Sequence, residues 1–259
     1  MWFWDCLTCL KSLTEMRLAK NLNILLFQIR KPDDPMRVGE VAAFADCLDV
    51  TPEHINAIDL IYSPPSPELL RKSDMIIIGG AGDYSVPEGG PWLDRALDAM
   101  RSLHAKRKPV FASCWGFQAV AAALGGSVIT DPKLAELGTL ELSLTEAGLN
   151  DPIFCTLGPK FLAHVGHHDT VIRLPDGAIR LASTPLIENH AFCMPDAPIY
   201  CTQFHPELKR DLLIQRLMTY PEYPKFILGI PLEELIKTLR ETPEANNLIR
   251  KFVDHVFGN

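Results

Sequence analysis

Uninterrupted apolar runs alternate with stretches of helical periodicity through the first half of the chain. A run without polar alternation is typical of a strand that is buried on both faces. Such runs occupy residues 23–29, 55–61, 74–80 and 109–114. Between them, apolar positions recur at helical spacing over 35–48 and 91–105, and a further helix begins near Trp115. The pattern predicts an α/β fold in three layers, with a doubly wound, mostly parallel sheet between helices.

The second half of the chain has shorter segments. Strand-like pieces separated by Pro, Gly and Asp predict added antiparallel strands within 127–203, in the order SVIT, GTLELSL, AIRLAST and PIYCTQF. The histidine-rich stretch 164–169 is expected to be a loop. No stretch resembles a linker, so we predict a single domain over 21–259 that follows an N-terminal extension, 1–20. The pattern predicts helices in the C-terminal part of this domain, from about 208 to 259.

Composition narrows the class of protein. The 259 residues are 47% apolar and 22% charged, as in a globular protein, and the net charge of −7 does not favour binding to nucleic acid or an anionic membrane. Seven scattered cysteines indicate a reducing compartment, so we expect a cytoplasmic protein. Cys6 and Cys9 form a C-x-x-C pair without a second pair at zinc spacing. The apolar N-terminal segment is too short to span a bilayer, and we favour a loosely attached extension over a peripheral amphipathic helix.

Cys114 lies where the strand 109–114 meets the next helix. The small residues Ala112 and Ser113 precede it and Gly116 lies two positions after it, as a sharp strand-to-helix turn requires. A thiol at such a turn lies above a helix N-terminus, where the dipole and free amides favour a thiolate and can hold an oxyanion. The alternative is a buried core thiol, because free cysteine is among the most buried residue types.

Two other segments favour the catalytic interpretation. His205 and Glu207 directly follow the apolar run IYCTQF, so the imidazole can take a thiol proton while the carboxylate orients it. The loop GGAGDYSV, at 79–86, lacks the third glycine of a dinucleotide fingerprint. We interpret it as a loop of free backbone N–H groups that supplies a second oxyanion donor.

Together, three ordered motifs resemble those of class I glutamine amidotransferases. They are GGAGDYSV after a strand, SCWGFQ in the place of the family's C-x-G-x-Q elbow, and QFHPE. The resemblance spans roughly residues 23–207 and implies a flavodoxin-like sheet with added antiparallel strands. GGAGDYSV and GHHDTVIRLPDG are most similar to stand-alone relatives of the glutaminase domain of GMP synthetase.

The resemblance implies a mechanism and a set of site residues. Cys114 would attack the side-chain amide of glutamine, His205 would carry the proton to the leaving amine, and Glu207 would orient His205. A γ-glutamyl thioester would form and be hydrolysed, with no metal or cofactor. The implied oxyanion and substrate-binding residues are Gly80, Gly82, Trp115, Gln118, His167, His168 and Asp169.

The sequence departs from the family pattern at three places. Ala112 stands where the family usually has glycine, which is expected to alter the turn slightly. Trp115 replaces a smaller residue or tyrosine and is expected to wall the pocket. Gly166-His167-His168-Asp169 replaces Ser-His-Gly-Asp, so His168 projects where the family keeps glycine. The spacing of His164, His167, His168 and Asp169 is not a recognised zinc pattern, and no metal site is predicted.

Three functions remain open from sequence. The first is a glutaminase that passes ammonia to a synthase, which we expect to be a separate chain. The second is a stand-alone γ-glutamyl peptide hydrolase that needs no partner. The third is a non-catalytic regulatory homologue, against which the presence of Cys114, His205 and Glu207 argues.

Overall fold

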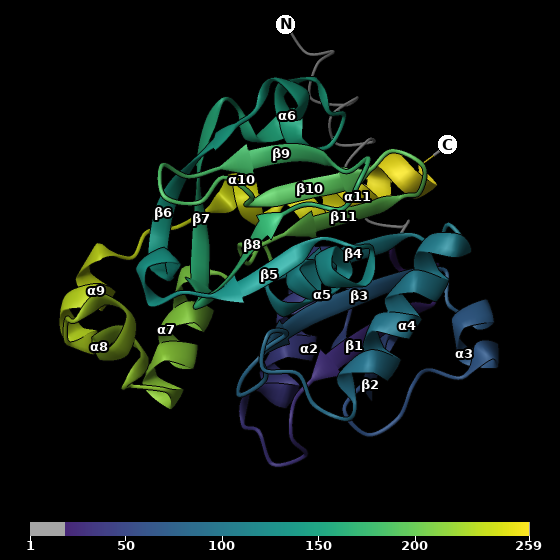
Figure 1. Ribbon diagram of the computed structural model, residues 1–259, viewed down its shortest axis with the longest axis horizontal. Helices are drawn as coiled ribbons and strands as arrows, with labels where there is room; N and C mark the ends of the chain where they lie inside the picture. The colour runs from purple at the N-terminus through teal and green to yellow at the C-terminus, as the bar shows by residue number, and fades with distance from the viewer. Residues whose placement is uncertain (1–18, 259) are drawn as a thin grey trace, which may run out of the picture.

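A nine-stranded sheet runs through the molecule (Figure 1). The computed structural model describes residues 19–258. The strand order is β2-β1-β3-β4-β11-β10-β9-β6-β7, and β5 and β8 form a separate pair. The strands of the first five positions are parallel, and the remaining pairings are antiparallel.

The strands have the following bounds: β1 Ile24–Ile29, β2 Ile55–Asp59, β3 Met75–Ala81, β4 Val110–Ser113, β5 Ser127–Thr130, β6 Glu136–Leu144, β7 Lys160–His167, β8 Asp169–Arg173, β9 Ile179–Ser183, β10 Ala191–Met194 and β11 Ile199–Thr202. The α-helices are α2 Met36–Leu48, α3 Pro67–Lys72, α4 Leu93–Ala105, α5 Trp115–Ala123, α6 Glu146–Asn150, α7 Arg210–Thr219, α8 Tyr223–Leu228, α9 Leu232–Thr238, α10 Pro243–Asn246 and α11 Leu248–Phe257. Three short 3₁₀ turns are η1 Pro52–His54, η2 Pro132–Leu134 and η3 Phe154–Leu157.

Helices cover both faces of the parallel strands. Successive side chains of a strand point to opposite faces. In β1, Leu25 and Phe27 therefore join the apolar cluster of α4 and α5, whereas Ile24 and Leu26 join that of α2 and α11. This burial on both faces explains the uninterrupted apolar runs of the sequence and confirms the predicted three-layer α/β fold.

The structure corrects two element predictions. β11, which lies within the predicted antiparallel piece PIYCTQF, pairs parallel with β4 and antiparallel only with β10. Residues 164–169 are not a loop, because His164 and His167 lie in β7 and Asp169 begins β8. In β7 the apolar residues Phe161, Ala163 and Val165 alternate with other residues and are buried. His164 is also fully buried, and its Nδ1 lies 3.2 Å from Thr139 Oγ1 of the neighbouring strand β6. A hydrogen-bond partner on a strand that is adjacent in the sheet but 25 residues away in the chain thus allows a polar residue to be buried there.

The C-terminal helices form two groups. α11 packs against the sheet face beside α2, and its Phe252 ring contacts Phe111 of β4. α7, α8 and α9, here called the lid, gather beside β6 and β7 at the lower left of Figure 1. Leucines hold the lid together and against β6: Leu137, Leu208, Leu213, Leu217, Leu235 and Leu239. The helical C-terminal segment expected from sequence therefore divides into a sheet layer and a lid.

The N-terminal prediction falls mostly outside the described residues, which include only its last two positions. The Cys6 and Cys9 pair is not among the described residues. Within residues 19–258, no helix is both long and apolar enough to cross a bilayer.

Candidate active site

Cys114 occupies a strained turn between β4 and α5. Its φ of 53° and ψ of −106° make it one of three non-glycine residues with positive φ in the described chain. Such strain persists only where the surrounding structure imposes it, and it is concentrated at functional sites. Ala112, where the family has glycine, is fully buried and does not have positive φ, so the strained conformation belongs to the cysteine itself. Cys114 Sγ lies 3.7 Å from the carbonyl oxygen of Gly166.

Gly116 permits this turn. A Cβ atom at Gly116 would lie 2.6 Å from the carbonyl oxygen of Ile78 and 2.9 Å from the Ile78 Cβ. Real Cβ atoms do not approach other atoms this closely, so α5 can lie against β3 only because residue 116 has no side chain. The close packing of α5 against β3 therefore requires the glycine of the C-x-G-x-Q-like motif.

His205 and Glu207 form a buried pair after β11. His205 Nδ1 lies 2.7 Å from Glu207 Oε1, and the side chains are 1% and 3% exposed. Burial lowers the pKa of His205, but attraction to Cys114 and Glu207 more than offsets this and raises it to about 9. Burial raises the pKa of Glu207, whereas the His205 charge and hydrogen bond lower it to a larger extent. His205 Nε2 is buried and has no hydrogen-bond partner in the described chain.

The cysteine and the histidine meet beside Gly80, near the end of β3. A Cβ atom placed on Gly80 would lie 3.3 Å from His205 Cε1 and 3.7 Å from Cys114 Cβ. Two side chains that follow different strands, β4 and β11, therefore border the same point. Trp115 opens α5, so its backbone N–H has no acceptor within the helix. The structure thus brings together the predicted triad and the two predicted oxyanion donors. These residues are Cys114, His205, Glu207, Gly80 and Trp115.

The remaining predicted residues line one hollow beside Cys114, here called the acyl hollow. Its lining is Ala81, Gly82, Tyr84, Cys114, Trp115, Gln118, Gly166, His167, His168, Asp169 and Tyr223. Trp115 lines the hollow as expected, and its ring packs on Trp92 with centroids 5.6 Å apart. Gln118 Nε2 donates to the carbonyl oxygen of Asp169 at 3.0 Å and to Gln203 Oε1 at 3.1 Å.

The side chains of His168 and Asp169 contribute polar groups to the lining of this hollow. Asp169 Oδ1 accepts a hydrogen bond from Thr130 Oγ1 at 2.6 Å. His168 Nδ1 lies 3.1 Å from the hydroxyl oxygen of Tyr223 in the lid. The histidine at the family's glycine position therefore contacts the lid, a role for Tyr223 that the sequence did not indicate.

His167 differs from the others, because both of its ring nitrogens have partners inside the protein. Nδ1 lies 3.0 Å from the carbonyl oxygen of Asp169, and Nε2 lies 3.2 Å from Glu136 Oε2. The same Glu136 oxygen lies 2.6 Å from His190 Nε2, and Thr184 Oγ1 donates to its other oxygen at 2.8 Å. Neither nitrogen of His167 is free for a substrate, so this residue positions the backbone of Asp169.

Sequence reasoning missed this Glu136 cluster because its members come from three distant places in the chain. Glu136 begins β6, His167 ends β7, and His190 directly precedes β10. Burial raises the pKa of Glu136, but hydrogen bonds from His167 and His190 outweigh burial and lower it to about 2. Burial lowers the pKa of His167. Among the described residues, Glu136, His167 and His190 are the one group whose ligand atoms, within 4.8 Å of one another, could hold a metal ion.

Comparison with known proteins identifies the family. A sequence model described as "Glutamine amidotransferase class-I" matches residues 53–217, which include the elbow, the glycine loop and the histidine–glutamate pair. The chain belongs to this family of glutamine amidotransferases.

Two kinds of relative are similar to the chain. One is a single subunit of the glutamine-hydrolyzing GMP synthase of Methanosarcina barkeri, which is 34% identical over 146 residues, 55% of this chain and 74% of the relative. The other is the glutamine-hydrolyzing GMP synthase of Streptomyces coelicolor, which is 30% identical over 185 residues, 69% of this chain but 34% of the relative. A solved glutamine amidotransferase from Thermotoga maritima has the same fold, with a TM-score of 0.73 at 19% identity, covering 92% of this chain and 99% of its own.

Proposed function

We propose that this chain is a glutaminase of the amidotransferase kind, in which Cys114, His205 and Glu207 form the catalytic triad. One observation carries the proposal. A cysteine with φ of 53° at a strand-to-helix turn and a buried histidine paired at 2.7 Å with a glutamate both border Gly80. This arrangement supports nucleophilic catalysis with a histidine as general acid and base.

The residues have separate roles in the proposed reaction. Cys114 Sγ attacks the side-chain amide carbon of glutamine while His205 Nε2 takes the thiol proton. Backbone N–H groups of Gly80 and Trp115 hold the oxyanion. His205 then gives its proton to the nitrogen as the C–N bond breaks and ammonia leaves. Water hydrolyses the γ-glutamyl thioester, which releases glutamate and restores the thiol.

The acyl hollow supplies the groups that hold the glutamyl part. Asp169 presents a buried carboxylate that can accept hydrogen bonds from the α-ammonium group of the substrate. Gln118 is fixed between Asp169 and Gln203 and lines the hollow beside the thiol. His168 adds a hydrogen-bonding imidazole tied to the lid through Tyr223.

The names of the relatives support a proposal for the fate of the ammonia. Several are named as one subunit of a GMP synthase, which implies that the synthase is a separate chain in those proteins. We propose that this chain likewise passes ammonia to a separate synthase chain, in the cytoplasm. We propose no metal or redox cofactor, because the reaction above uses only side chains and backbone amides.

Release of glutamate from L-glutamine tests the proposed function. The unmodified protein should release glutamate, and Cys114→Ala should not, because the carbon–sulfur bond cannot form. Cys155→Ala is the matched control, since this cysteine is exposed and unpaired and does not line the acyl hollow.

A second measurement covers the case in which turnover needs a partner. A glutamine analogue with a diazoketone in place of the amide should label Cys114, as mass spectrometry of the peptides would show. Glutamate release that survives in Cys114→Ala, or labelling that spares Cys114, would contradict the proposal.

A further inference from the structure

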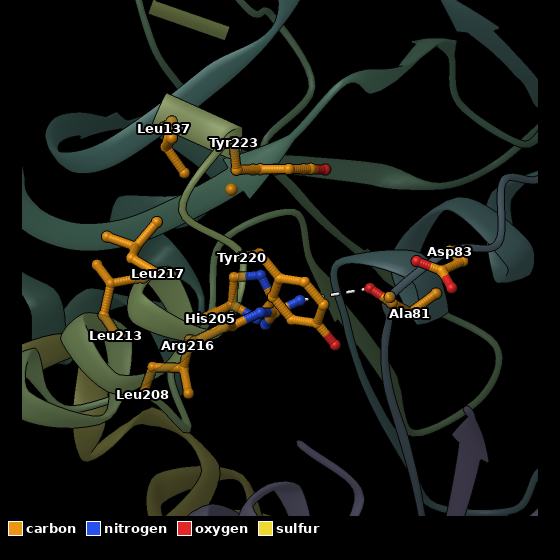
Figure 2. Close-up of a pocket in the computed structure, with 12 residues that line it drawn as sticks. Ala81, Asp83, Leu137, His205, Leu208, Leu213, Arg216, Leu217, Tyr220 and Tyr223 are labelled. Carbon is orange, nitrogen blue, oxygen red and sulfur yellow. Dashed lines mark hydrogen bonds between the residues drawn. The ribbon is translucent and has the colours of Figure 1, made fainter. Parts of the chain in front are cut away.

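A larger cavity lies beside the acyl hollow, on the side of His205. It has a volume of about 120 Å³ and is here called the lid pocket. Its lining is Ala81, Gly82, Asp83, Leu137, Gly166, His205, Leu208, Leu213, Arg216, Leu217, Tyr220 and Tyr223. Figure 2 shows Leu213 and Leu217 on one side and Ala81 and Asp83 on the other, with His205, Arg216 and Tyr220 between them in this view. Leu213 and Leu217 of the lid form its apolar wall together with Leu137 of β6 and Leu208.

The two cavities divide between the triad residues. Cys114 lines the acyl hollow, whereas His205 lines the lid pocket, and both cavities share Ala81, Gly82, Gly166 and Tyr223. In the proposed reaction the acyl carbon joins Cys114, and the departing nitrogen takes a proton from His205. Whatever is attached to that nitrogen must therefore extend into the lid pocket. Glutamine has only hydrogen there and leaves this apolar cavity unfilled.

Arg216 provides a cation in the lid pocket. Its Nη2 donates to the carbonyl oxygen of Ala81 at 3.3 Å, and it forms no ion pair with any carboxylate of residues 19–258. Arg30, by contrast, is buried and pairs with both Asp34 and Glu40. The Arg216 charge contributes to the lowered pKa of Glu207, but the guanidinium is engaged in no ion pair within the described chain. Beside an apolar wall, it suits a ligand that has both a carboxylate and an apolar group.

The position of Arg216 limits how far that carboxylate can be from the leaving nitrogen. A Cβ atom on Gly80 would lie 3.7 Å from Arg216 Nη2 and 3.3 Å from His205 Cε1, so the guanidinium and the imidazole border the same point. In an α-amino acid, one carbon separates the nitrogen from the carboxylate carbon. Such a leaving group can therefore place its nitrogen at His205 and its carboxylate at Arg216 at the same time.

The apolar wall indicates the side chain of this amino acid. An apolar cavity of about 150 Å³ is known to hold a benzene molecule. By the same comparison, the 120 Å³ of the lid pocket leaves room for an aliphatic side chain of about four carbons between the leucines that line it.

We propose that this enzyme hydrolyses γ-glutamyl dipeptides whose second residue is an aliphatic α-amino acid, held by the lid pocket with its carboxylate on Arg216. The proposal rests on the proposed function and uses the same triad. The Cys114 sulfur–carbon bond forms, the γ-amide C–N bond breaks, and the nitrogen leaves with the proton from His205 as the free amino acid. Water then cleaves the thioester to glutamate, so one dipeptide and one water give two amino acids.

The test compares two substrates that differ in one group. γ-L-Glutamyl-L-leucine carries the carboxylate, and γ-L-glutamyl-isoamylamide is the same molecule without it. A charge-assisted contact of about 1.5–3 kcal/mol corresponds to roughly a 10- to 150-fold preference in kcat/KM for the dipeptide. L-Glutamine is measured alongside both, and Cys114→Ala should abolish every reaction.

Arg216→Met should bring the ratio of the two kcat/KM values close to one, whereas Arg216→Lys should keep part of the preference. Arg71→Met is the matched control, because Arg71 is an exposed arginine of α3 that does not line the lid pocket, and it should leave the ratio unchanged. The substrate pair on the unmodified enzyme tests the proposal even if a variant fails to fold.

The outcomes separate the two proposals. Two outcomes would overturn the lid-pocket inference but not the proposed glutaminase function. One is cleavage of glutamine without cleavage of the dipeptide, and the other is a kcat/KM ratio that Arg216→Met does not change. Absence of Cys114-dependent reaction with all three substrates, together with no labelling of Cys114, would overturn the proposed function itself.

Discussion

At the scale of single residues, the candidate site combines a strained backbone with a charged pair that is closed to solvent. Cys114 is held at positive φ, and His205 is almost completely buried against Glu207. An imidazole in such a place would lose its proton easily if burial acted alone. The attraction to Cys114 and Glu207 outweighs burial, so the pKa of His205 is raised to about 9.

The first residue-scale prediction is a pH profile. In the proposed reaction the proton that His205 takes from Cys114 must stay on the imidazole until it passes to the leaving nitrogen, and a pKa of about 9 favours that protonated state at neutral pH. We expect kcat/KM for glutamine to fall as pH rises through about 9. Glu207→Gln removes one of the charges that raise the pKa, so the decline should move to lower pH. A decline at the same pH in both proteins would contradict this.

The same shift affects stability, and its sign follows from the direction. A histidine whose pKa is raised in the folded state stabilises it below the unfolded pKa of about 6.5 and loses that contribution as pH rises through about 9. Thermal unfolding measured across the pH range of the assay would therefore separate lost catalysis from lost fold.

At the scale of elements, the site depends on how closely α5 lies against β3. We expect Gly116→Ala to reduce the free energy of unfolding by about 1–3 kcal/mol, because the added methyl meets the Ile78 backbone. Activity should fall as well, since the same shift displaces Cys114. Unfolding by denaturant and glutamate release would measure the two effects.

A second glycine provides the control. Gly39 lies inside α2, and a Cβ there would meet only Met36 Cε, at 3.8 Å. Gly39→Ala should therefore stabilise the protein by about 0.5–1 kcal/mol through helix propensity. Equal effects of the two substitutions would show that the close approach at Gly116 has no energetic importance.

At the scale of the whole molecule, the Glu136 cluster joins β6, β7 and the segment before β10 to the acyl hollow, which His167 lines. Glu136→Ala should cost about 3–5 kcal/mol of stability, because His167 and His190 would be buried without their shared carboxylate. Glu136→Gln keeps the shape and serves if the alanine variant does not fold. Glu141→Ala, on the same strand but in an exposed pair with Lys160, should cost less than about 1 kcal/mol.

The pH dependence of this loss gives a further check. A carboxyl whose pKa is lowered to about 2 stabilises the fold above its unfolded pKa of about 4.5 and loses that contribution as pH falls toward 2. The difference in unfolding free energy between the unmodified protein and Glu136→Gln should therefore shrink over this acid range. A difference that stays constant would mean that the Glu136 charge contributes nothing.

Prediction from sequence succeeded where burial alone sets the pattern. The central parallel strands β1, β3 and β4 are buried on both faces, so their apolar runs are visible without any knowledge of neighbours. It failed for 164–169, where His164 and His167 are buried by partners on β6 that lie far away in the chain. A buried strand is hard to predict from sequence when it contains polar residues whose hydrogen-bond partners lie far away in the chain.

The sequence by itself determined the α/β class, the strand-end cysteine and the His-Pro-Glu motif, because local periodicity and short motifs encode them. Only the tertiary structure decided which residues share a cavity. It placed Arg216 and Tyr223 of the lid beside His205 and His168, and it turned His167 away toward Glu136. These outcomes depend on contacts between segments that are distant in the chain, and local sequence patterns do not determine which side chains the fold brings together.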